Sequence, residues 1–148
     1  MPTDPDLFQA LVRKILADID AVGRHITGVA PAPGDEDADT FAYTTGLTRT
    51  LGVELAIATL GFELASPILS RVASAITTVP TEGERIDLGD GQPVLFHRAG
   101  DTSRFGVTRF IYGGDPVHGV WQVLWPDPDG RFPTEAGYDH ARFPQPLY

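Results

Sequence analysis

The sequence predicts an α+β domain in which a mostly antiparallel, twisted sheet, or a small and partly open barrel, carries two main helices. Three observations lead to this prediction: an amphipathic helical pattern at the N-terminus, a series of short strand-like segments, and frequent turns. The chain of 148 residues contains 16 glycines and 13 prolines, so turns take a larger share than in an average domain. This length fits one domain over residues 1–148, with an N-terminal helix within residues 1–22 followed by an α+β region over residues 23–148.

The first expected element is a helix over residues 5–22, where apolar side chains recur every three or four positions. Thr3 or Asp6 would cap its start, and Gly23 would end it in the left-handed conformation. A second helix is expected over residues 63–76. Pro67 is tolerated there in the first turn, and if it lay deeper the helix would have to begin at Ser66.

Apolar runs and alternating patterns predict the strands, with Gly-rich turns between them. The segment 101–112 fits two patterns, since Phe105 and Arg109 share either a strand face or a helix face, and both alternatives stay open. The tail over residues 132–148 contains prolines and aromatic residues, which predicts an ordered, extended coil over the core. The expected strands cover residues 25–29, 41–45, 53–60, 85–88, 93–97 and 117–125.

Charge and composition exclude several classes of function. The chain has 11 basic and 20 acidic residues and a net charge of −9, whereas a general nucleic-acid binder needs clustered Lys and Arg. With no long apolar run and no signal pattern, we expect a cytoplasmic protein that does not enter membranes. The absence of cysteine excludes disulfides, thiolate metal sites and a cysteine nucleophile.

No metal site and no catalytic residue is predicted. The acidic segment 30–40 lacks the spaced oxygen ligands and closing Glu of a calcium loop and is expected to be a solvated loop. No serine lies in a Gly-x-Ser-x-Gly setting, and whether the protein is an enzyme stays open. Four histidines share no metal-ligand spacing: His25, His97, His118 and His140.

The loop over residues 43–50 reads Tyr-Thr-Thr-Gly-Leu-Thr-Arg-Thr. Oriented hydroxyls and backbone N–H groups beside one guanidinium are typical of a phosphate site, which makes Thr44, Thr45, Thr48 and Arg49 candidate ligand contacts. In the alternative interpretation, the threonines favour the strand and bond to their own turn, while Arg49 pairs with an internal carboxylate.

Aromatic residues in the second half form the other candidate site. Tyr112 and Trp121 could hold a planar ligand by stacking, although two indoles on one strand face are also typical of a core. Gln122 is expected on the face that holds Val120 and Leu124. A buried amide there needs partners, so Gln122 is either a structural clamp or a ligand contact.

Three segments follow one another along the chain: Phe41-Ala42-Tyr43-Thr44-Thr45-Gly46-Leu47-Thr48, Tyr112-Gly113-Gly114, and the run from Gln122 through Trp125-Pro126-Asp127 to Pro133. In residues and order they resemble a bacterial family of small proteins known only as a domain of unknown function. The likeness covers roughly residues 23–147. Members often have Trp where Thr134 stands and His-Pro where Gly52-Val53 stands, and the resemblance implies no activity. The order of loop, strand and helix is also similar to flavin-binding split β-barrels, in which Thr and Ser hydroxyls and an Arg hold the phosphate of flavin mononucleotide.

The function expected from these patterns is the binding of a small phosphorylated planar ligand of nucleotide or flavin type. One alternative is an acidic protein–protein interaction module without a small ligand. Another is a flavin-dependent oxidoreductase, in which flavin mononucleotide supplies the chemistry. The candidate ligand-binding residues are Thr44, Thr45, Thr48, Arg49, Tyr112, Trp121 and Gln122.

Overall fold

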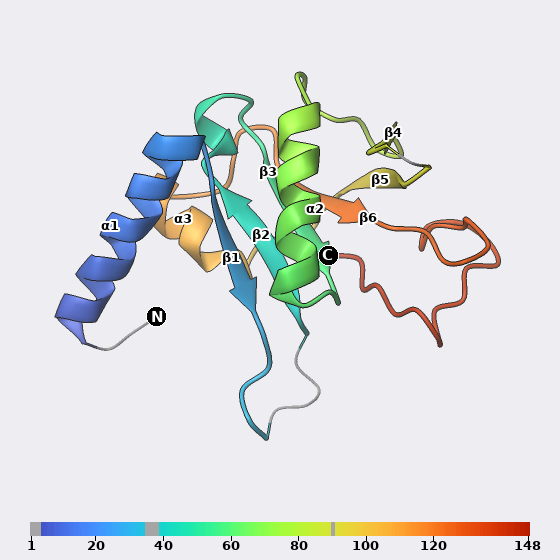
Figure 1. The fold of residues 1–148 in the computed structure, drawn as a ribbon, viewed down its shortest axis with the longest axis horizontal. Coiled ribbons are helices and arrows are strands. Elements are labelled where there is room, and N and C mark those ends of the chain that lie inside the picture. Colours follow the sequence, from blue (N-terminus) through green and yellow to red (C-terminus); the bar gives the residue numbers. More distant parts are fainter. Residues whose placement is uncertain (1–3, 35–38, 90) are drawn as a thin grey trace.

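A six-stranded mixed sheet forms the centre of the molecule, with the strand order β1-β2-β3-β6-β5-β4 (Figure 1). The computed structural model describes residues 4–34, 39–89 and 91–148. Neighbouring strands are antiparallel except for β3 and β6, which run parallel. The α+β class is therefore confirmed, and of the two predicted forms the open sheet is the one observed. The strands are β1 (His25–Val29), β2 (Phe41–Thr45), β3 (Glu54–Ala58), β4 (Arg85–Asp87), β5 (Pro93–Arg98) and β6 (Val120–Leu124).

Helices cover both faces of this sheet. α2 (Phe62–Ala75) packs Leu69 and Val72 on one face, and α3 (Gly106–Tyr112) lies with the C-terminal tail on the other. α1 (Pro5–Val22) flanks the edge strand β1 (Figure 1). A short 3-10 turn, η1 (Leu47–Arg49), joins β2 to β3.

α1 follows its predicted bounds and buries Ile15 and Ile19. Its cap is Asp4, whose Oδ1 accepts the N–H groups of Asp6 and Leu7 at 2.9 and 3.4 Å. The predicted cap at Asp6 is therefore wrong, and Thr3 lies outside the described residues. Gly23, at φ 85°, ends the helix as predicted.

α2 begins at Phe62, and Pro67 lies inside it, beyond the first turn. The expected first-turn position of Pro67 and the alternative start at Ser66 are therefore both wrong. Pro67 lies on the exposed side of the helix. Because Pro67 has no N–H, the carbonyl of Glu63 has no hydrogen-bond partner within the helix. Water can reach this carbonyl on the exposed side.

The structure also decides the open segment and shortens three of the expected strands, β4 only by its last residue, Leu88. Residues 106–112 form a helix that ends at Gly113, with φ 74°. β3 stops at Ala58 because Thr59 takes a positive φ of 76°. β6 begins only at Val120, since Gly119 (φ 88°) still belongs to a turn.

Alternation along β6 divides the core as predicted. Trp121 and Val123 join the cluster under α2, whereas Val120 joins an aromatic cluster with Phe105 and Tyr148 on the opposite face. The tail is an ordered coil without strands. Its Phe132 is fully buried, but Leu147 is 44% exposed and does not anchor it.

Two further findings concern only the described part of the chain. None of its helices has both the length and the apolar character needed to cross a membrane. It contains no group of three or more His, Asp or Glu side chains placed to hold a metal ion. Residues 35–38 of the acidic segment lie outside the described residues.

Candidate functional site

The threonine loop, residues 43–50, folds around a carboxylate of the protein itself. Glu54, the first residue of β3, is 1% exposed. Its two oxygens accept the hydroxyls of Thr44 and Thr48 at 2.7 and 2.5 Å. They also accept three successive backbone N–H groups, those of Gly46, Leu47 and Thr48, at 3.0, 3.2 and 2.9 Å. The loop is therefore an anion site whose anion is Glu54.

Local backbone geometry aims these donors at one point. The three N–H groups belong to the start of η1, where no intrahelical acceptor exists for them. Gly46 has φ 136°, and a Cβ there would lie 2.4 Å from the carbonyl oxygen of Gly23. Only glycine fits this turn, which places β2, η1 and the end of α1 against each other.

Burial raises the pKa of the Glu54 carboxyl above its usual value. The hydroxyls of Thr48 and Thr44 and the loop N–H groups act in the opposite direction, because they stabilise the charged form. The carboxylate is thus costly to bury and depends on its five donors, which ties β3 to the loop.

Thr45 and Tyr112 lie on the α3 side of this loop. The Thr45 and Thr108 hydroxyls are 2.7 Å apart, and the Thr108 hydroxyl donates to the carbonyl of Thr44 at 3.0 Å. The Tyr112 hydroxyl is buried with no hydrogen-bond partner in the described part of the chain. Burial, and secondly the negative charge of Glu54, raise the pKa of Tyr112.

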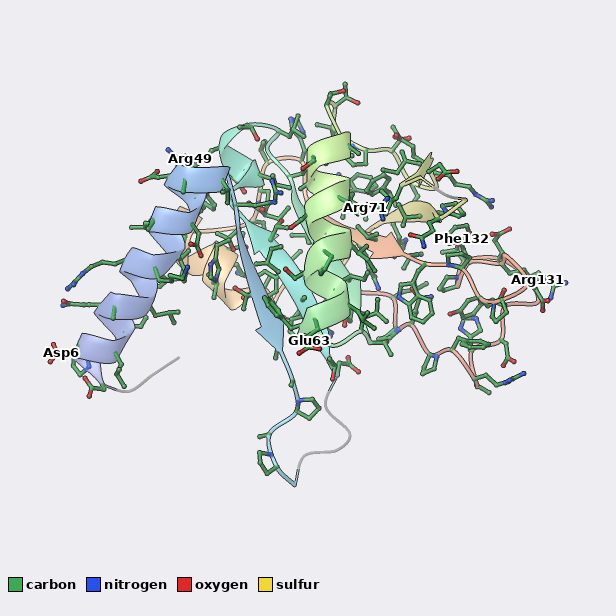
Figure 2. The ribbon with its side chains drawn as sticks, in the orientation of Figure 1. Asp6, Arg49, Glu63, Arg71, Arg131 and Phe132 are labelled. Atoms are coloured by element: carbon green, nitrogen blue, oxygen red, sulfur yellow. The ribbon has the colours of Figure 1, made fainter. Side chains whose placement is uncertain are left out.

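Arg49 points away from the loop. Its guanidinium donates to Asp20 of α1 at 3.1 Å, and the two side chains are 54% and 72% exposed. Figure 2 shows Arg49 beside the C-terminal end of α1. It lines a cavity of about 360 Å³ together with Asp20 and Gly46. The alternative interpretation expected Arg49 to pair with a carboxylate of the protein. Asp20 is that partner, and the ion pair lies at the surface.

Gln122 and Trp121 lie within the fold. The Gln122 amide donates to the carbonyl of Pro146 at 2.6 Å and accepts the N–H of Tyr148 at 3.0 Å, so it clamps the tail to β6. Trp121 is 5% exposed, and its Nε1 donates to the carbonyl of His118 at 2.9 Å.

The structure therefore gathers only part of the predicted site. Thr44 and Thr48 meet at Glu54, with Thr45 adjacent. Of the seven predicted residues, Arg49 alone lines one of the five cavities described for this molecule. A ligand contact at these seven residues stays a prediction. Glu54 itself was missed, although a single acid at the head of an apolar strand signals a buried charge that needs partners.

A second arrangement of polar groups lies in a groove between α1, β1 and α2. Its volume is about 430 Å³, and it is lined by polar side chains and by the apolar Val22, Ile26 and Phe62. The Phe62 ring lies against Gly28, where an added Cβ would come within 2.7 Å of it. The polar lining is Lys14, Asp18, Arg24, His25, Ser66 and Ser70.

Asp18 organises the α1 side of this groove. Its carboxylate contacts Lys14 Nζ at 2.7 Å and His25 Nδ1 at 2.8 Å, and these two hydrogen bonds lower the pKa of Asp18. With Nδ1 engaged, the other ring nitrogen of His25 remains for a further contact. On the α2 side, Arg24 reaches the carbonyl of Ser70 and the hydroxyl of Ser74 only at 3.5 Å.

Charge distinguishes this groove from the other cavities. Its lining has two full positive charges, on Lys14 and Arg24, against one negative charge on Asp18. The lining of the cavity at Arg49, and that of a further cavity at Arg98, each contain one arginine and one aspartate. The two remaining cavities have no formally charged lining residue in the described chain. In a chain of net charge −9, the groove is a local site of positive charge.

Fold and site together define a small α+β domain that has an open mixed sheet and a threonine loop closed on an internal carboxylate. The chain belongs to the DUF4262 family, described as a domain of unknown function, whose family model matches residues 18–139. The resemblance to a family of unknown function is thus confirmed, and the likeness to flavin-binding barrels is not. Comparisons with curated proteins and with solved structures found no match.

Proposed function

We propose that this protein binds a small phosphorylated planar ligand in the groove between α1, β1 and α2. One observation carries the proposal: in an acidic chain, this groove places Lys14, Arg24 and His25 beside an exposed aromatic ring. Its volume of about 430 Å³ lies within the range of small-molecule sites.

The phosphate would be held by Arg24, with the hydroxyls of Ser66 and Ser70 beside it. A guanidinium has five N–H donors, and those of Arg24 make only long contacts of 3.5 Å within the protein. Donors therefore remain for a bidentate phosphate contact. Lys14, which is 68% exposed, would add charge at the groove entrance.

The planar part would lie on Phe62. This ring is 52% exposed, and Gly28 leaves room for it, because a Cβ at that position would collide with the ring. Aromatic stacking contributes about 0.5–1.5 kcal/mol beyond burial of area. The proposal concerns binding and assigns no reaction, and flavin mononucleotide is one member of the ligand class.

Matched probe pairs test the proposal by calorimetric titration. Flavin mononucleotide against riboflavin, and adenosine monophosphate against adenosine, differ only in the phosphate. We expect the phosphorylated member to bind about 10- to 100-fold more tightly, the range of a charged hydrogen bond. Arg24→Gln should remove most of that difference, while Phe62→Ala should weaken both members by about 2- to 12-fold.

Arg49→Gln is the matched control, because it removes an arginine from the adjacent cavity and should leave every titration unchanged. If Arg49→Gln weakens binding and Arg24→Gln does not, the ligand lies at the threonine loop instead. If neither pair binds at millimolar concentration, the proposal fails, and the acidic interaction module becomes the better interpretation.

A further inference from the structure

A polar cavity of about 430 Å³ lies at the end of β5, between the loops that precede and follow α3. Its lining contains one positive and one negative side chain, Arg98 and Asp115. The volume lies within the range of small-molecule sites. The other lining residues are small or uncharged: Ala99, Gly100, Thr102, Pro116 and Gly119.

The guanidinium of Arg98 lies at the wall of this cavity, over Gly119. A Cβ on Gly119 would come within 2.7 Å of Nε and 3.1 Å of Cζ of Arg98, so the glycine leaves room for the guanidinium. Glu82 accepts the backbone N–H of Arg98 at 3.0 Å and does not contact its side chain. Within the described part of the chain the guanidinium has no hydrogen bond and no ion pair. Its five N–H donors are therefore available to a ligand.

Asp115 supplies the opposite charge in the same lining. Its Oδ2 accepts the hydroxyl of Thr102 at 2.8 Å, which holds the carboxylate in place. Nε of Arg109 is 3.9 Å from Oδ1, too far for a hydrogen bond. This oxygen therefore keeps lone pairs for an N–H donor.

The two charges of this cavity are not paired with each other. Arg98 and Asp115 both belong to the described residues, and no ion pair joins them. The cavity at Arg49 has the same formal charges, but there Arg49 contacts Asp20 at 3.1 Å. A ligand with one charge would meet a like charge in the Arg98 cavity, whereas a ligand with both charges has a partner for each.

We infer that this cavity is a binding site for a free α-amino acid. The carboxylate would accept two N–H groups from the Arg98 guanidinium, whose planar fork matches it. The ammonium group of the same molecule would donate to Oδ1 of Asp115. This site is separate from the groove at Arg24 and does not depend on the function proposed there.

L-alanine, L-lactate and L-alaninamide are suitable probes, because they have similar sizes and differ in their charged groups. The backbone N–H signals of Gly100 and Gly119 in ¹H–¹⁵N spectra of the full chain at pH 7 report binding, with Gly46 in the Arg49 cavity as internal control. We expect alanine to bind about 10-fold more tightly than alaninamide, the lower end for a charged hydrogen bond because Arg98 is exposed. Lactate should bind about 2- to 5-fold more weakly than alanine, the range of an exposed ion pair.

Two variants assign these preferences to residues. Arg98→Gln should remove the preference for alanine over alaninamide, and Asp115→Asn the preference over lactate. Both side chains are exposed, and asparagine keeps an acceptor for the Thr102 hydroxyl, so we expect both variants to fold. Arg49→Gln is the matched control and should leave every titration unchanged.

The three probes on the unmodified chain decide the matter if a variant fails to fold. The inference is wrong if alanine does not saturate the Gly119 signal at millimolar concentration, or if Gly46 moves as much as Gly119. Equal binding of lactate and alanine would show an anion site instead and would also refute it. The same holds if folded Arg98→Gln keeps the preference over alaninamide.

Discussion

Replacing Glu54 tests whether the threonine loop depends on the carboxylate that it surrounds. In Glu54→Gln, one carboxylate oxygen becomes an NH₂ donor. At the Oε1 position the Thr44 hydroxyl could rotate to accept from it, but the N–H of Leu47 would lose its acceptor. At the Oε2 position two backbone N–H groups would lose theirs. One unpaired buried donor costs about 1–3 kcal/mol, so we expect the free energy of unfolding to fall by about that amount.

Glu54→Ala removes the acceptor of all five donors and leaves a cavity. We expect a loss of about 3–5 kcal/mol, as when one member of a buried charged contact is deleted. Urea unfolding followed by tryptophan fluorescence measures both variants. Their free energies of unfolding can be compared if the dependence on urea concentration has the same slope in each protein. Glu63→Gln is the control. Glu63 lies exposed in the first turn of α2 (Figure 2), where the loss should stay below about 1 kcal/mol.

Adding a small anion shows whether Glu54→Ala loses stability because the loop lacks its anion or because the loop is distorted. Formate should stabilise Glu54→Ala but not the unmodified protein, by about 1.4 kcal/mol at ten times its dissociation constant. Sodium chloride at equal ionic strength is the reference. If Glu54→Gln stays within about 0.5 kcal/mol of the unmodified protein, and formate has no selective effect, the loop does not depend on Glu54 and our reasoning is refuted.

Three further predictions concern the surface and the tail. Arg49→Ala should change the free energy of unfolding by at most about 0.5 kcal/mol, because its ion pair with Asp20 is mostly exposed; a larger loss in the same urea assay would contradict this. Deleting residues 136–148 should lower Tm by several degrees, because both tail contacts of Gln122 disappear; an unchanged Tm would show a tail that adds no stability. Burial raises the pKa of Tyr148 to about 12, so the folded state favours its neutral form and stability should fall as the pH rises from about 10 to 12. Tyr148→Phe should reduce this decline in urea unfolding at pH 9 and 11, and an equal decline in both proteins would refute the assignment.

Periodicity was sufficient to predict the elements whose apolar pattern is long or strictly alternating. α1 and β2 follow their predicted bounds. β2 is buried throughout, whereas α1 buries only Ile15 and Ile19 of its apolar face and leaves Leu7, Leu16 and Val22 exposed. The pattern of residues 101–112 did not distinguish a helix from a strand. α3 has only seven residues, and the helical and strand periods both fit so short a segment. The end of β3 at Thr59 was not predictable, because a positive φ at a β-branched residue contradicts local preference.

The donors of the threonine loop and the acid Glu54 can both be identified in the sequence, but the contact between them cannot. Hydroxyls and N–H groups arranged for an anion look the same whether that anion is a ligand or a side chain of the same protein. The antiparallel pairing of β2 with β3 brings the carboxylate into the loop, and local patterns do not encode that contact. A charged residue in a buried strand has to be paired, so the donors of such a loop serve an internal acid before they serve a ligand. We therefore place the proposed ligand at positive charge that has no close internal partner, and in this chain Arg24, with only long internal contacts, has such a charge.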